Sequence, residues 1–187
     1  MAVPETLAVS TALVALAEMG DKTQLLSFVL AAKLKRPWPI IAGIVVATLA
    51  NHFLAGWIGA GLATLLPPTA LKWAIALSFF AFGLWALKPD TLDGGREYSA
   101  RSAFLTTLVA FFWVETGDKT QLATVALAAR YDALAAVVMG TTVGMLVANA
   151  PAVWLGEALA QRVNMKWMRW LAAALFVALG ALTLVAG

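Results

Sequence analysis

The chain has 187 residues, of which 62% are hydrophobic and only 12% are charged. Soluble domains are about 45–50% apolar and about 25% charged, so this composition excludes an ordinary soluble domain and indicates an integral membrane protein. The basic residues fall mostly in short breaks between apolar runs, which argues against a nucleic-acid-binding surface. Because cysteine is absent, disulfides and thiolate metal sites are excluded.

Six apolar segments follow one another along the chain, each near the twenty or so residues that a membrane-spanning helix needs. We expect spans at Pro4–Ala32, Trp38–Leu62, Ala70–Leu87, Arg101–Ala129, Ala133–Leu159 and Trp167–Ala186. Prolines and charged residues mark the breaks between them, and no break is long enough for a soluble domain. The predicted fold is therefore an all-α integral membrane protein with six transmembrane helices.

The two halves of the chain are related by an offset of about 97 positions. The phrase EMGDKTQL at 18–25 returns as ETGDKTQL at 115–122, and the match continues without a gap. Further identical pairs are Gly43 with Gly140, Trp57 with Trp154, Trp73 with Trp170, and Phe79 with Phe176. This is an internal duplication. We predict a three-helix repeat at 1–87, a linker at 88–100 and a second three-helix repeat at 101–187, within one transmembrane domain.

Three spans per half is an odd number, so the second half must enter the membrane from the opposite side. The halves are then inverted-topology repeats, which commonly place substrate near the midplane where they meet. Nine basic residues lie in the breaks after the first, third and fifth spans: Lys33, Lys35, Arg36, Lys88, Arg96, Arg101, Arg162, Lys166 and Arg169. The other side carries only Lys72 and Arg130. By the positive-inside rule, we expect an inner (plasma) membrane protein with a cytoplasmic linker and both termini outside the cytoplasm.

Each half places charged groups inside its first apolar segment. Inserting a charged side chain into the membrane interior costs roughly 2.5–3.5 kcal/mol on insertion scales. A chain that repeats this pattern is expected to use those groups for ion or proton handling. On one continuous helix the two acids of a motif share a face, and the lysine follows the glutamate by four residues, the favourable order for an ion pair. The acids and the amides one turn further on are Glu18, Asp21 and Gln24, and Glu115, Asp118 and Gln121.

If the motifs face each other, four carboxylates and two carboxamides meet, a set that suits Mn²⁺, Ca²⁺ or Mg²⁺. We expect Gly20 and Gly117 to let an ion or another helix approach the backbone. Lys22 and Lys119 reduce the formal charge to minus two, which one divalent cation or two protons would neutralise. Such a site could exchange metal for protons. The lysines either tune the acids or reach toward an aqueous cavity.

Several other interpretations remain open from the residues alone. Each motif could be a structural salt bridge within one helix, and an acidic centre also fits a cation channel or a non-transporting assembly factor. No HExxH motif or cysteine nucleophile supports an intramembrane enzyme. His52, beside Asn51, could relay protons or bind Mn²⁺, but a helix-to-helix hydrogen bond is the favoured role, since Asn149 stands at the equivalent position.

The pattern E-φ-G-D-[KR]-[ST], once in each half, resembles the signature of the second Ca²⁺/cation antiporter family, which includes the Gdt-type transporters and bacterial manganese exporters. Thr116 departs from the apolar φ position. The resemblance covers essentially the whole chain and implies export of Mn²⁺ and/or Ca²⁺ against H⁺, with the manganese branch favoured. It implies that the ion-binding acids are Glu18, Asp21, Glu115 and Asp118. It also implies that their motif partners are Lys22, Thr23, Lys119 and Thr120.

We therefore expect a secondary active transporter rather than an enzyme. It should need no cofactor, and its partners should be membrane lipid and the divalent cation, without nucleic acid. Homo-oligomer formation is left open.

Overall fold

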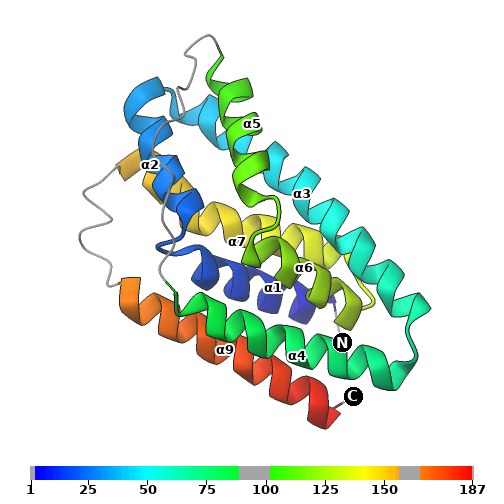
Figure 1. Cartoon of the computed structure of the whole chain (residues 1–187). Helices are drawn as coiled ribbons and strands as arrows, with labels where there is room; N and C mark the ends of the chain where they lie inside the picture. The colour runs from blue at the N-terminus through cyan, green and yellow to red at the C-terminus, as the bar shows by residue number, and fades with distance from the viewer. Residues whose placement is uncertain (1–2, 89–101, 156–164, 187) are drawn as a thin grey trace.

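The structure is a computed structural model that describes residues 3–88, 102–155 and 165–186. Within these ranges every regular element is a helix (Figure 1). The helices are α1 (Val3–Glu18), α2 (Lys22–Leu34), α3 (Pro37–Leu65), α4 (Pro68–Ala86), α5 (Ala103–Glu115), α6 (Lys119–Arg130), α7 (Leu134–Leu155) and α9 (Met165–Ala186). The predicted linker at 88–100 lies outside the described residues, apart from Lys88.

The long apolar helices establish an integral membrane protein. Among the described residues, α3, α4, α7 and α9 are each long and apolar enough to cross a membrane, and α1 with α2 is a fifth candidate that bends by 70°. The predicted first and fourth spans, Pro4–Ala32 and Arg101–Ala129, are each broken into two helices. The expectation of one continuous helix through each motif was therefore wrong.

The helix boundaries repeat along the chain. The helices α2 and α6 begin at Lys22 and Lys119, which are 97 positions apart. The same spacing separates the starts of α3 and α7 (37 and 134). The duplication seen in the residues thus extends to where the helices begin.

Helices of one half pack mainly against helices of the other. The most extensive contacts join α1 to α7, α3 to α5 and α6, and α4 to α9 (Figure 1). Two equivalent glycines permit these approaches. A Cβ atom at Gly140 would lie 2.7 Å from the carbonyl oxygen of Leu7, and one at Gly43 would lie 2.8 Å from that of Phe104. Each half is therefore held largely by the other.

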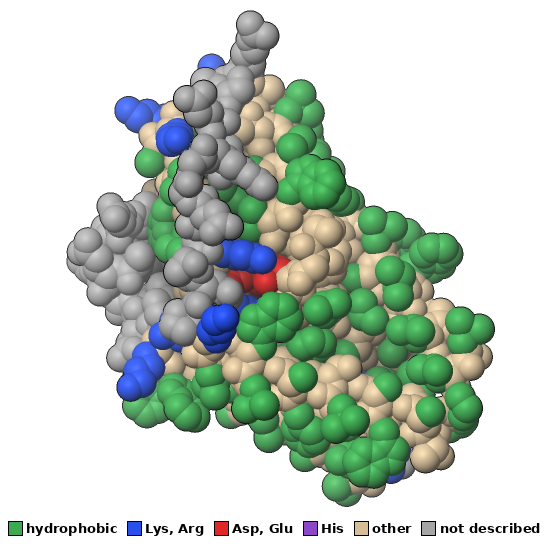
Figure 2. All heavy atoms as spheres, viewed as in Figure 1, with side chains coloured by type: hydrophobic (Ala, Val, Ile, Leu, Met, Phe, Trp, Pro, Cys, Tyr) green, Lys and Arg blue, Asp and Glu red, His purple; other side chains and the backbone are tan. Residues whose placement is uncertain are grey.

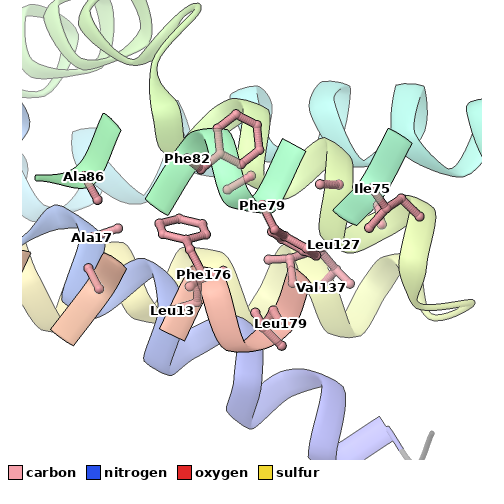
Figure 3. Packing of buried hydrophobic residues seen from close by; sticks show 14 of the residues in the cluster. Leu13, Ala17, Ile75, Phe79, Phe82, Ala86, Leu127, Val137, Phe176 and Leu179 are labelled. Carbon is pink, nitrogen blue, oxygen red and sulfur yellow. The ribbon is translucent and has the colours of Figure 1, made fainter. Parts of the chain in front are cut away.

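A hydrophobic core lies where α4 and α9 meet, with residues from α1, α6 and α7 around it (Figure 3). The ring of Phe176 lies against those of Phe79 and Phe82, with ring centroids 6.3 and 5.9 Å apart. Large apolar side chains also cover the outside, including Trp57 and Trp113, and Figure 2 shows a face that is largely hydrophobic. Such a surface suits contact with lipid acyl chains.

Candidate ion-binding site

Each repeated motif lies at the break between two helices. The helices α1 and α5 end at Glu18 and Glu115, and the chain then turns through Gly20 and Gly117. These glycines have φ angles of 80° and 78°, in the left-handed region that favours glycine. A Cβ atom at Gly117 would meet nothing within 4 Å, so the backbone angle, rather than a close approach, accounts for glycine there.

The aspartates of the motifs stand at the starts of the following helices. Asp21 is the N-cap residue of α2 and Asp118 that of α6, and neither side chain makes a capping hydrogen bond. Their carboxylates therefore lie beside the partly positive ends of two helices, where negative charge is favoured. The sequence led us to expect that the glutamate and aspartate of a motif share one face of a helix. They do not, because the helix ends between them.

Both motif lysines form ion pairs with the other half. The Nζ atom of Lys22 lies 3.0 Å from Oδ1 of Asp118, and the Nζ atom of Lys119 lies 2.5 Å from Oδ1 of Asp21. The expected pairing of glutamate and lysine four residues apart on one helix was wrong, because the helix ends between them. Instead, the lysine of each half pairs with the aspartate of the other half, so the two ion pairs are equivalent and connect the halves.

The glutamates have different surroundings despite their equivalent positions. Glu18 accepts hydrogen bonds from hydroxyl groups of both halves, from Thr23 on one oxygen and from Thr120, at 2.5 Å, on the other. Oε1 of Glu115 lies 3.4 Å from Nε2 of His52. Its Oε2 has no hydrogen-bond partner within the described part of the chain. The pseudo-symmetry is therefore not complete at this site.

Three carboxylates lie close enough together to hold one cation. Oxygen atoms of Glu18, Asp21 and Asp118 lie within 4.8 Å of one another, and each of these residues is 0–1% exposed. Glu115, also 1% exposed, is an acidic neighbour that acts electrostatically on Glu18. Buried carboxylates gathered at helix ends are a chemical environment for a hard or borderline divalent cation.

The motif glutamines join each helix break to the other half. The Oε1 atoms of Gln24 and Gln121 accept hydrogen bonds from the backbone N–H groups of the motif glycines, at 2.9 and 2.7 Å. The Nε2 atom of Gln24 donates to the carbonyl of Ala148, and that of Gln121 donates to Oδ1 of Asn51, both at 2.9 Å. Because Ala148 takes part through its backbone, no side-chain motif in the sequence could have indicated it.

The remaining polar residues of interest are Asn51, His52 and Asn149. Asn51 also donates to the carbonyl of Phe112 at 3.0 Å, and Asn149 accepts from the hydroxyl of Ser27 at 2.8 Å. Both asparagines therefore make helix-to-helix hydrogen bonds. His52 is 0% exposed, and its ring lies beside the carboxylate of Glu115.

The two ion pairs differ in their access to solvent. The side chain of Lys22 is 25% exposed, whereas that of Lys119 is 4% exposed, and both aspartates are almost fully buried. Figure 2 shows acidic and basic side-chain atoms next to each other at one place on a mainly hydrophobic face. The buried site is thus more accessible beside the Lys22 pair than beside the Lys119 pair.

Comparison with known proteins places the chain in a family. The family described as divalent cation/proton antiporter GDT1 matches residues 6–94 and, separately, residues 103–187. The chain belongs to this family. The resemblance noted from the two motifs is confirmed, and the family is one of membrane cation antiporters.

Relatives from three organisms cover nearly the whole chain. A Vibrio cholerae protein named "Putative manganese exporter" is 48% identical over 182 residues, which cover 97% of this chain and 91% of the relative. GDT1-like protein 5 of Arabidopsis thaliana is 28% identical over 94% of this chain and 93% of its own length. GDT1-like protein sll0615 of Synechocystis is 27% identical over 88% of this chain and 89% of its own length. No solved structure matches the chain.

Proposed function

We propose that the protein exports Mn²⁺ from the cytoplasm in exchange for H⁺, with Ca²⁺ as a second substrate candidate. The observation that carries this proposal is the buried group of Glu18, Asp21 and Asp118, formed where the two broken helices meet. Membership of a divalent cation/proton antiporter family supports the reaction type, and the name of the Vibrio relative favours manganese among the divalent cations.

The proposed ligands are the carboxylates of the two motifs. Glu18, Asp21 and Asp118 would hold the cation, and Glu115 would join them after a small movement, since it already lies beside Glu18. We place Gln24 and Gln121 outside the ligand set, because both ends of each amide are already hydrogen-bonded within the protein. Their role is to fix the helix breaks.

Charge balance supplies the coupling. The four acids and the two motif lysines carry a formal charge of minus two when all are ionised. One divalent cation or two protons would neutralise it, whereas holding both or neither would leave net charge in a low-dielectric interior, which is costly. A cation entering the site would also compete with Lys22 and Lys119 for the aspartate oxygens. Exchange of metal for protons follows from these charges.

We further propose six membrane crossings arranged as two inverted three-helix repeats, at 1–87 and 101–187, in which each broken pair counts as one crossing. The shared spacing of helix starts and the family match in each half support this arrangement. In Figure 1 the start of α1 and the end of α9 lie at the same end of the bundle, as an even number of crossings requires. Loop charges favour a cytoplasmic linker at 88–100 and external termini.

Alternating access would then exchange the environments of the two lysines. In the present state the Lys22–Asp118 pair is partly exposed and the Lys119–Asp21 pair is buried. Because the halves are related by sequence and helix spacing, the opposite state is obtained by giving each half the conformation of the other. The Lys119 pair would then become exposed and the Lys22 pair buried.

The variants Glu18→Gln and Asp118→Asn test this assignment in proteoliposomes. Each variant removes one carboxylate with little change in shape, so metal-driven proton flux should be abolished while the protein still folds. Glu5→Gln is a matched control, because Glu5 lies in the exposed first turn of α1, away from the motif. Flux at the wild-type rate in both site variants would contradict the assignment.

A further inference from the structure

A cavity of about 950 Å³ lies at the end of the bundle where α1 begins and α9 ends. It is formed by the start of α4, the end of α6 with the connection to α7, and the end of α9, together with Thr6 of α1. The helix α6 starts at the acidic site and reaches this cavity with its last residues, Ala129 and Arg130. Twelve residues of helix separate the two places by about 18 Å along the axis.

The polar side of this cavity is basic and hydroxyl-bearing. Lys72 and Arg130 line it together with Thr69 and Thr183, and Asp132 contributes one acid. Arg130 is held in position, because it donates a hydrogen bond to the hydroxyl of Thr183 and its guanidinium carbon lies 5.5 Å from the centre of the Tyr131 ring. Its buried Nε atom has no hydrogen-bond partner among the described residues. A guanidinium that is held in place and lines a cavity suits an oxygen anion.

The start of α4 adds to this preference for negative charge. The helix begins at Pro68, and its first backbone N–H groups have no partner within the helix, so this end carries a partial positive charge. Phosphate groups commonly bind where such a helix end lies beside basic side chains. Because Thr69 and Lys72, both near the start of α4, line the cavity, the backbone and the side chains favour the same kind of ligand.

The other side of the cavity is apolar, which points to a lipid. Leu71, Ile75 and Leu184 line it, and Trp73 beside them is 52% exposed. Tryptophan at the ends of membrane helices typically lies at the level of the lipid headgroups. Free phosphate would gain nothing from these apolar residues, whereas a phospholipid could place its phosphate near the cations and its acyl chains along the apolar wall.

We propose that this cavity binds the headgroup phosphate of an anionic phospholipid. Lys72 and Arg130 are the two basic residues that loop charges place on the external side, so the lipid would come from the outer leaflet. Bound there, it would contact α4, α6 and α9 at once. This site is separate from the cation site and does not depend on which ion is transported.

Binding is tested with the full chain in neutral detergent. The probes are phosphatidylglycerol, phosphatidylcholine with the same acyl chains, and inorganic phosphate, and the readouts are thermal unfolding and retained lipid by native mass spectrometry. We expect phosphatidylglycerol to raise the unfolding temperature and to be retained. Removing one cation should weaken its binding about fivefold, since each Lys or Arg contributes about 1 kcal/mol toward anionic lipid. Phosphatidylcholine and inorganic phosphate should give little or no shift.

The variants are Lys72→Gln and Arg130→Gln, with Lys33→Gln and Arg169→Gln as matched controls away from the cavity. Because Arg130 bonds to α9, its substitution could also disturb packing, so Lys72→Gln is the decisive variant. Wild-type binding of phosphatidylglycerol by Lys72→Gln would overturn the proposal. An equal response to phosphatidylcholine, or a full response to inorganic phosphate alone, would overturn it as well.

Discussion

Lys119 and Lys22 occupy equivalent positions in the two halves, yet their surroundings differ enough to give a sharp prediction. Each forms an ion pair with an aspartate of the other half. The side chain of Lys119 is 4% exposed and that of Lys22 is 25% exposed. The substitutions Lys119→Met and Lys22→Met remove the same ammonium group from two environments. They should therefore differ in their effect on stability.

The magnitudes follow from burial. Removing one partner of a buried ion pair costs about 3–5 kcal/mol, because it leaves an uncompensated charge away from water. Asp118 is as buried as Asp21, but Lys22 itself is partly exposed, so water can reach the Asp118 carboxylate once the ammonium group is removed. We therefore expect a loss of about 1–2 kcal/mol there, between the values for exposed and buried pairs. In a chain of this size, 1 kcal/mol shifts the unfolding temperature by about 2–4 °C. Lys119→Met should thus lose roughly 6–20 °C, and Lys22→Met roughly 2–8 °C.

Thermal unfolding of the purified protein at neutral pH, in one detergent and without added divalent cation, measures both losses. The double variant Lys119→Met/Asp21→Asn removes both charges of the buried pair and should recover most of the stability. It should still fail to transport, because Asp21 is a proposed ligand. Equal losses for the two single variants, or a larger loss for Lys22→Met, would refute the reasoning.

Three further predictions follow from other contacts in the structure. Gly140→Ala should lower the unfolding temperature, because its Cβ would lie 2.7 Å from the backbone of α1, whereas Gly61→Ala, which meets nothing within 4 Å, should be neutral or slightly stabilising. Gln121→Leu removes the amide that fixes the second helix break, so reconstituted Mn²⁺ transport should slow while the variant stays folded; an unchanged initial rate would contradict this role. His52→Ala should reduce the initial rate without abolishing it, since His52 contacts Glu115 but lies outside the three-carboxylate group, and complete loss of transport would contradict that placement.

Much of the architecture could be predicted from the sequence because the duplication is visible in individual residues. The paired glycines and tryptophans predicted equivalent halves, and in the structure α1 closely approaches both Gly140 and Gly144. The family was likewise evident from the repeated motif. These features depend on residue identity and spacing, which a single sequence displays directly.

The helix breaks were missed although local signals were present. Glycine just after a helix and aspartate just before one are common at helix ends, and Gly20–Asp21 and Gly117–Asp118 have this order. The apolar residues on both sides and the four-residue spacing of glutamate and lysine favoured a continuous helix instead. Which aspartate each lysine contacts depends on how the halves dock, and no local pattern shows that.

The central claim is that a proton gradient drives a divalent cation uphill through this protein. The most direct measurement uses reconstituted wild-type protein with equal Mn²⁺ on both sides, an imposed pH gradient and a fluorescent reporter of internal Mn²⁺, and repeats it with Ca²⁺ and Mg²⁺. Antiport predicts that Mn²⁺ accumulates in the more acidic compartment, against its own gradient, until the proton gradient decays. A channel would only equalise the concentrations, and movement solely down the Mn²⁺ gradient at every imposed pH difference would contradict the account.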